Sequence, residues 1–208
     1  MCAQPAPRPY APRPYAQVAR AAATADARAR ILDAFAAMLS DRDLAAITLD
    51  EVAEAAASTR QTVIRYFGGK DGLLLAIGEH FGRQIRARRD VPDDAGLNRQ
   101  LTALVADYEV VGEVVVQLLA QEARLPGLRA MLDLGRAGHR EWVDTVFAAP
   151  LAALPPDARA RRADQLYAAT DVNIWKLYRS GFGHSAEHTA ALMAEHASLL
   201  TQTPKEPT

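Results

Sequence analysis

Apolar residues recur every three or four positions along most of the chain, which is the period of one buried face of an α-helix. The first such stripe includes Ile31, Phe35 and Leu39, and we expect its helix to begin at a Thr24 cap and to end near residues 40–43. The strict alternation of a β-strand is not convincing anywhere. The pattern predicts an all-α protein.

Two short helices are predicted directly after the first helix. Thr48 and Glu51 have the spacing of a capping box at the start of LDEVAEAAA. Ser58 or Thr59 can cap a second short segment, RQTVIRYF, and GGK ends it before a longer helix that starts near Asp71. Two short helices joined by about three residues and held against a longer one are typical of a helix-turn-helix.

The second short helix carries many hydrogen-bond donors. Val63 and Phe67 are one turn apart and can anchor it on the core, which turns Arg60, Gln61, Thr62 and Arg65 outward. Arginine can read guanine, glutamine can read adenine, and threonine can bind phosphates or bases. Lys70, at the start of the next helix, could add a phosphate contact. A charged surface loop between two core helices is the alternative.

A long helix is predicted over residues 96–122, and its later part is apolar nearly all round. Glu109, Glu113, Gln117 and Gln121 form one polar line along it. This line is either a solvent-facing edge or, through Glu113 or Gln117, a polar contact inside a pocket, because pockets pair apolar walls with few polar groups.

Three further helices complete the second half. The first is the short segment GLRAMLDLG, with Pro126 in its first turn. The second runs from Pro155 and Pro156 to about Arg179. The last covers about residues 185–200. The candidates for pocket walls are Tyr108, Met131, Trp142 and Trp175. A core role is the alternative for each of them. The last helix has one leucine-rich and one alanine-rich face, and two faces on each terminal helix suit a symmetric dimer built on a four-helix bundle.

Composition and charge add limits to this picture. Half of the 208 residues are apolar and 24% are charged, which is ordinary for a globular protein. Residues 1–89 carry 13 basic against 9 acidic side chains, and residues 90–208 carry 11 against 16, so the two halves are expected to meet different partners. The single cysteine excludes a disulfide framework, and neither a signal peptide nor a membrane span is recognised. We therefore expect a soluble cytoplasmic protein.

The first 22 residues form a predicted disordered tail that contains a tandem repeat, APRPY APRPY. No acidic residue precedes Asp26, so Arg8, Arg13 and Arg20 could contact phosphates as an arm. A passive solvated leader is the alternative. Residues 203–208 are expected to be a second tail.

Residues 31–77 resemble the DNA-binding domain of the TetR family of bacterial transcriptional regulators. The matching positions are Ile31, Leu32, Ala34, Thr48, Val52, Ala53, Ala56, Thr62, Tyr66, Phe67, Lys70 and Leu73 or Leu74. The chain departs from the family pattern at four positions. Ala57 stands at the turn glycine, Ser58 at the valine that follows it, Thr59 at the serine, and Ile64 at an aromatic that commonly contacts phosphate. The resemblance assigns DNA contact to Thr48, Ser58, Thr59, Arg60, Gln61, Thr62, Arg65, Tyr66 and Lys70.

The resemblance implies an N-terminal three-helix helix-turn-helix DNA-binding domain over residues 23–70, a connecting helix over residues 71–90, and a helical ligand-binding and dimerisation domain over residues 91–202. We expect a homodimeric repressor that binds double-stranded DNA at a palindromic operator and is released by a small, largely apolar effector. We predict no cofactor, no membrane association and no enzymatic activity. An enzyme or a helical ligand carrier that retains a helix-turn-helix is the alternative.

One short motif points to different chemistry. The segment HSAEH, residues 184–188, fits the H-x-x-E-H pattern of a class of zinc peptidases. It follows a Gly-Phe-Gly break, so His184 is expected to lie outside the next helix, and no third ligand is suggested. We predict a surface or interface role for these histidines and no metal site.

Overall fold

The computed structural model describes residues 14–202, except for the side chains of residues 14–17 and 93. Within this range the chain forms helices and turns and no strand, which confirms the all-α prediction. The elements are α1 (Pro14–Asp41), η1 (Leu44–Ala46), α2 (Leu49–Ala55), α3 (Arg60–Phe67), α4 (Lys70–Arg88), η2 (Asp93–Ala95), α5 (Leu97–Gln121), α6 (Gly127–Val146), α7 (Ala148–Ala152), α8 (Pro156–Ala169), α9 (Val172–Lys176), η3 (Leu177–Gly181) and α10 (Ala186–Thr201).

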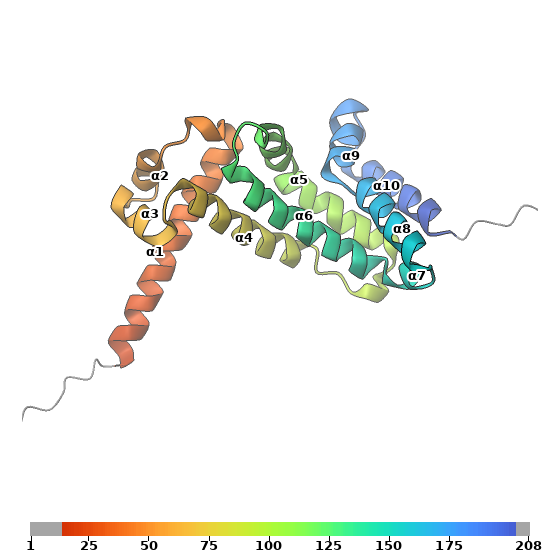
Figure 1. Ribbon diagram of the computed structural model, residues 1–208, viewed down its shortest axis with the longest axis horizontal. Helices are drawn as coiled ribbons and strands as arrows, with labels where there is room; N and C mark the ends of the chain where they lie inside the picture. Colours follow the sequence, from red (N-terminus) through yellow and green to blue (C-terminus); the bar gives the residue numbers. More distant parts are fainter. Residues whose placement is uncertain (1–13, 203–208) are drawn as a thin grey trace, which may run out of the picture.

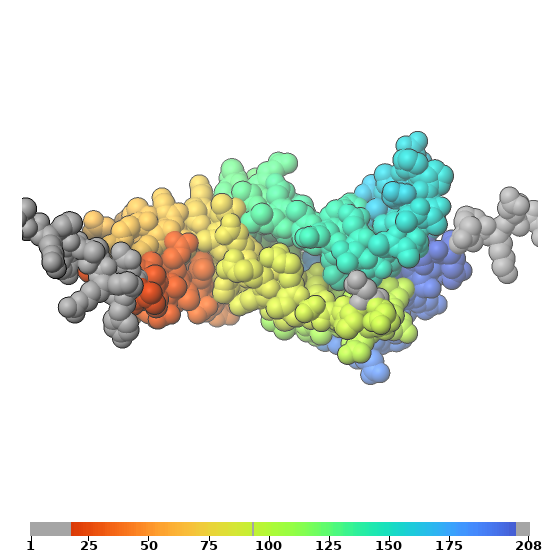
Figure 2. All heavy atoms as spheres, turned by 90° about the horizontal axis from the view of Figure 1, so that it is seen from below, coloured from red at the N-terminus to blue at the C-terminus, as the bar shows by residue number. Residues whose placement is uncertain are grey.

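The molecule is elongated, with α1 to α3 at one end and α7 to α10 at the other (Figure 1). Figure 2, seen from below, shows the same outline with the N-terminal and C-terminal helices at opposite ends. Helix α3 has the predicted bounds, and α2 begins as predicted but ends at Ala55, two residues before the end of the predicted segment. Local capping signals define where both helices begin. Among the described residues, no helix is long and apolar enough to cross a membrane.

The first helix begins earlier than predicted. It starts at Pro14, so residues 14–22, expected in the tail, are helical, while residues 1–13 with Arg8 and Arg13 lie outside the described range. Thr24 lies inside α1 and donates its hydroxyl proton to the Arg20 carbonyl at 2.9 Å. The expected cap at Thr24 was therefore wrong, because the alanines that precede it favour a continuous helix.

The helix-turn-helix and the second half share one hydrophobic core. Leu73, Leu74 and Ile77 of α4 are buried in it together with the apolar side chains of α1 to α3 and of the first turns of α6. Gly78 of α4 lies so close to Met131 of α6 that a Cβ would be 2.6 Å from the Met131 side chain. The two helices therefore pack at short range, and α4 connects the two ends of the molecule.

Helix α5 is central to the second half, as predicted, and packs against α10, α9, α6 and α4. Helix α6 is longer than the predicted short segment and runs over 20 residues to Val146, with Pro126 immediately before it. Gly127 in its first turn packs against Asp71 and Leu74 of α4, whereas Gly135 is exposed.

The predicted single helix over residues 155–179 was wrong. It is broken at Thr170, whose buried hydroxyl donates to the Leu166 carbonyl at 2.8 Å. Asp171 then accepts a hydrogen bond from the Asn173 amide at 2.9 Å and caps α9. Side-chain bonds of this kind compete with the helical backbone pattern, which explains the break.

Helix α10 covers the predicted segment and has the expected small-residue face. Ala190, Ala194 and Ala197 are buried, which allows α10 to lie close to α5. Met193, predicted on the leucine face, is also fully buried, whereas Leu199 is 61% exposed. The outer face of α10 thus combines Leu199 with polar side chains such as Glu195 and His196.

Candidate DNA-binding surface

The start of α2 is fixed by the predicted capping box. The Thr48 amide donates to Glu51 Oε2 at 2.8 Å, and the Glu51 amide donates to Thr48 Oγ1 at 3.3 Å. Hydrogen bonds from Thr48 and from Arg42 lower the pKa of Glu51 to about 2. The Thr48 hydroxyl also donates to Glu51 at 2.8 Å, so its proton is engaged within the cap rather than directed at DNA.

The turn between α2 and α3 is made by Ala57, as the sequence predicts. Its φ is 49°, the one positive value at a non-glycine residue in the described chain. This left-handed conformation allows the Ser58 amide to donate to the Ala53 carbonyl at 2.8 Å. The alanine therefore produces the turn that glycine would adopt at lower conformational cost.

Helix α3 is capped and anchored from within. Thr59 Oγ1 accepts a hydrogen bond from the Thr62 amide at 3.2 Å, and the two hydroxyls lie 3.0 Å apart. Val63 is fully buried and Phe67 is 8% exposed, so both anchor predictions are confirmed. The opposite side of α3, which carries Arg60, Gln61 and Arg65, therefore faces outward.

The outward face carries the predicted donors. Arg60, Gln61 and Arg65 are exposed, and Ser58, Thr62 and Tyr66 are half-buried at its edge. Arg60 lies 3.3 Å from Asp50 of α2, and both side chains are more than half exposed, so this pair can be exchanged for a phosphate or a base. Ile64, at the position where the family pattern has an aromatic, is 42% exposed.

Arg65 and Tyr66 form a joined pair at the end of this face. The Arg65 guanidinium lies 4.9 Å from the centre of the Tyr66 ring and donates to its hydroxyl at 3.3 Å. Because the hydroxyl accepts this bond, its own proton remains available. The pair can offer both a charge and a hydroxyl donor to DNA.

Lys70 differs from its predicted role. Its ammonium donates to the carbonyls of Leu44 at 2.6 Å and of Ile47 at 2.8 Å, which holds the η1 turn against α4. Burial lowers its pKa, and nearby Asp43 opposes that shift. Two of its three N–H groups are used inside the protein, so it supports the helix-turn-helix and leaves one N–H for a phosphate.

Sequence reasoning missed Arg28. Its Nη1 donates to the Tyr66 carbonyl at 2.7 Å, and its guanidinium lies 4.6 Å from the centre of the Phe67 ring. Arg28 precedes Ile31 by three residues and therefore lies on the buried side of α1, which was the available signal. It attaches the last turn of the recognition helix to α1.

The six candidate ligand contacts do not form one group. The ring centres of Tyr108 and Trp175 lie 5.9 Å apart in the core between α5, α9 and α10. Trp142 packs at the edge of that core. Met131 belongs to the separate core beside α4. Glu113 pairs with Lys176 at the surface, and Gln117 is exposed. The structure thus favours the solvent-edge interpretation of the polar line over the pocket interpretation.

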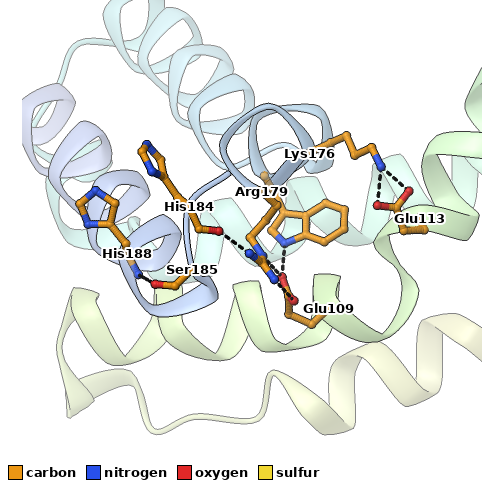
Figure 3. A network of polar contacts seen from close by, with 8 residues as sticks. Glu109, Glu113, Lys176, Arg179, His184, Ser185 and His188 are labelled. Atoms are coloured by element: carbon orange, nitrogen blue, oxygen red, sulfur yellow. Dashed lines mark hydrogen bonds and ion pairs between the residues drawn. The ribbon is translucent and has the colours of Figure 1, made fainter. Parts of the chain in front are cut away.

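Figure 3 shows the contacts of Glu109 and Glu113, two residues of this polar line. Glu109 accepts hydrogen bonds from Trp175 Nε1 at 2.7 Å and from the Arg179 guanidinium at 2.7 and 2.8 Å. These contacts attach α9 and η3 to α5. His184 lies before α10, as predicted, and its ring contacts that of His188. Among the described residues, no three potential ligands converge on a metal-sized site.

A buried polar group lies at the centre of the second half and was not predicted. Tyr108 donates its hydroxyl proton to the Thr170 carbonyl at 2.9 Å, and His139 Nε2 is 3.0 Å from Thr170 Oγ1. The His139 ring stacks on Trp142 and meets the Tyr167 ring edge to face. Burial, reinforced by the charge of Arg89, lowers the pKa of His139 to about 3, so the ring is neutral.

The end of α4 is attached to this group by a buried ion pair. Asp107 of α5 has no exposed surface and accepts hydrogen bonds from Arg88 Nε at 2.6 Å and from Arg89 Nε at 2.8 Å. The Arg89 guanidinium also lies 5.0 Å from the centre of the Tyr108 ring. Arg89 thus contacts both Asp107 and the aromatic core beside Tyr108.

The recognition helix α3 is anchored on the core and has an exposed basic face. Helix α4 joins it to the helices of the second half. This arrangement defines the class of helix-turn-helix transcriptional regulators. Residues 31–77 match the model of the bacterial regulatory proteins of the tetR family. The chain is 34% identical over 159 residues to the HTH-type transcriptional regulator BetI of Burkholderia thailandensis, covering 71% of this chain and 79% of that one. BetI of Paraburkholderia phymatum is 32% identical over 158 residues, with the same coverage. The protein belongs to the TetR family.

Solved structures agree with this fold. A putative TetR-family transcriptional regulator from Rhodococcus sp. superposes with a TM-score of 0.68 at 20% identity, covering 86% of this chain and all of that one. A transcriptional regulator from Rhodococcus sp. Rha1 gives a TM-score of 0.64 at 16% identity, covering 83% and 95%. At these identities the likeness shows the arrangement of helices.

Proposed function

We propose that this TetR-family regulator is a homodimeric repressor that binds a two-fold symmetric operator in double-stranded DNA through α3. The observation that carries the proposal is the recognition helix, with Val63 and Phe67 buried and Arg60, Gln61 and Arg65 exposed. These side-chain types read base edges and neutralise phosphates. Because its relatives are named as transcriptional regulators, regulation is favoured over enzymatic activity.

Dimer formation is supported by apolar side chains that the single chain leaves exposed. Leu177 at the start of η3 and Phe182 directly after it are 45% and 59% exposed, and Leu199 of α10 is 61% exposed. All three belong to the C-terminal segments, at the end of the molecule away from α3 (Figure 1). A second copy that covers this end would present two recognition helices to half-sites about one duplex turn apart, or a multiple of it.

Release by a small, largely apolar effector is proposed to act through α4. An effector that enters the aromatic core beside Tyr108 and Trp142 would contact Arg89 and alter its pairing with Asp107. Because Arg89 directly follows α4, the altered pairing would move α4 and change the spacing of the recognition helices. An effector acts in this way only if it binds the two arrangements with different affinity.

The experiment that tests the proposal is selection of bound sequences from a random duplex library. The wild-type protein should enrich a two-fold symmetric site, and Arg60→Ala and Arg65→Ala should each weaken its binding. The matched control is Arg99→Ala, because Arg99 is exposed on α5 and lies about 33 Å along that helix from Gln121. Absence of any enriched site would refute DNA recognition, and equal losses in all three variants would refute the role of α3.

A further inference from the structure

An open concave surface lies between the N-terminal part of α1 and the recognition helix. It has a volume of about 500 Å³ and is lined by Arg20, Ala23, Thr24, Arg65 and Tyr66. Two of its lining residues belong to the DNA-binding face of α3, and the other three belong to a helix outside the helix-turn-helix. The concavity therefore extends the face of α3 onto α1.

The N-terminal part of α1 projects beyond the domain core. Arg28 is its last attachment to α3, through the Tyr66 carbonyl, and Pro14 lies 14 residues earlier, or about 21 Å along the helix axis. Residues 18–26 are all exposed, and Val18 is 68% exposed. Figure 1 shows α1 continuing past α3 toward its N-terminal end. Within the described chain, this segment contributes to no core, which leaves it free for a partner.

The charge of this region favours an anionic partner. No acidic residue occurs before Asp26 in the sequence, and no ion pair between the described residues includes Arg20. Across the concavity, Arg65 is bonded to the Tyr66 hydroxyl, whose own proton is unused. Arg20, Arg65 and Tyr66 can therefore each direct a donor at one oxyanion, and the lining contains no carboxylate.

We propose that this concavity binds a backbone phosphate of DNA that flanks the half-site read by α3. The inference rests on the proposed binding of DNA by α3, because that binding brings the duplex to this side of the protein. Arg20 is eight residues, or about 12 Å, from Arg28 along α1, which corresponds to three or four base-pair steps of about 3.4 Å. Arg20 thereby lengthens the footprint without reading sequence.

The test uses the full chain and a duplex enriched by the selection, in a long form and in a form trimmed by four base pairs at each end. Arg20→Gln should weaken binding to the long duplex about fivefold or more and lower the slope of log affinity against log salt by about 0.9 for each bound protomer. Binding to the trimmed duplex should change little. Arg20→Lys should retain most of the affinity, because a phosphate contact needs a positive charge and does not need the planar guanidinium group.

Arg99→Gln is the matched control, since it removes the same charge from an exposed helical position at the other end of the molecule. The inference is overturned if Arg20→Gln and Arg99→Gln have equal effects, or if Arg20→Gln loses the same affinity on both duplexes. In either case wild-type recognition of the selected site would leave the proposed function intact. If the wild-type protein selects no duplex, both the proposed function and this inference fail.

Discussion

Gly112 of α5 faces Trp175 of α9 so closely that a Cβ on Gly112 would lie 2.4 Å from the indole ring. The ring cannot move away easily, because Trp175 is 3% exposed and its Nε1 donates to Glu109 at 2.7 Å. The close approach brings α9 onto α5 and fixes one wall of the aromatic core.

Gly112→Ala should therefore destabilise the protein, although alanine is the better helix former by about 1 kcal/mol. The clash should dominate and lower the free energy of unfolding by about 1 to 2 kcal/mol, measured by urea denaturation. Gly135→Ala is the control, because nothing lies within 4 Å of a Cβ at that position of α6. It should be neutral or stabilising, and a similar loss in both variants would contradict the packing argument.

Ala57→Gly should stabilise the turn between α2 and α3. Alanine at a φ of 49° is disfavoured by about 1 to 2 kcal/mol, whereas glycine adds about 0.5 to 1 kcal/mol of unfolded-chain entropy. The midpoints of these two ranges give a net gain of about 0.7 kcal/mol in thermal or urea unfolding, within a range of about 0 to 1.5 kcal/mol. Ala37→Gly, at an exposed position inside α1, should instead lose about 1 kcal/mol. A loss at both positions would show that the turn is not strained.

Asp107→Asn should be among the most destabilising changes of a single charge. It leaves the guanidinium groups of Arg88 and Arg89 without their carboxylate, and breaking one side of a buried ion pair costs about 3 to 5 kcal/mol. Asp164→Asn removes a comparable contact, with Arg140 at 2.7 Å, but the Asp164 side chain is 72% exposed. That control should lose less than about 1 kcal/mol. Equal losses in urea denaturation would contradict a special role of the buried pair.

The helix-turn-helix could be predicted from sequence because its signals are local. The capping box of Thr48 and Glu51, the cap at Thr59 and the glycines after Phe67 each act within a few residues. The resemblance then added the exception at Ala57, which the structure confirms. Fold and recognition helix follow from such short-range rules.

The second half could not be predicted in the same detail, because its determinants are contacts between distant residues. The break at Thr170 depends on a side-chain bond that competes with helix formation, and helix propensity alone does not reveal it. Tyr108 and Met131 were both predicted as walls of one pocket, yet they belong to different cores. Asp107 is buried because Arg88 and Arg89 at the end of α4 pair with it, and the sequence around Asp107 contains no signal of that distant contact.

His139 supplies a prediction about pH. Thr170 Oγ1 donates to the Leu166 carbonyl, so we infer that His139 Nε2–H donates to that hydroxyl and that Nδ1 carries no proton. Nδ1 is buried and has no hydrogen-bond partner among the described residues. A proton on Nδ1 would place a charge in the core near Arg89 and Arg140, which oppose it. The folded protein therefore resists protonation of this ring.

The folded pKa of His139 is about 3, below the value of 6.5 for an unperturbed histidine, so the unfolded chain binds a proton first as the pH falls. Stability should fall between about pH 6.5 and pH 3, by at most about 1.4 kcal/mol for each pH unit from this residue. His139→Phe, compared with the wild type by urea denaturation at pH 5.0 and 7.5, should reduce the difference between the two values. His188→Asn, exposed in α10, should leave that difference as it is in the wild type. If His139→Phe also leaves it unchanged, burial of a neutral His139 is not the source of the acid sensitivity.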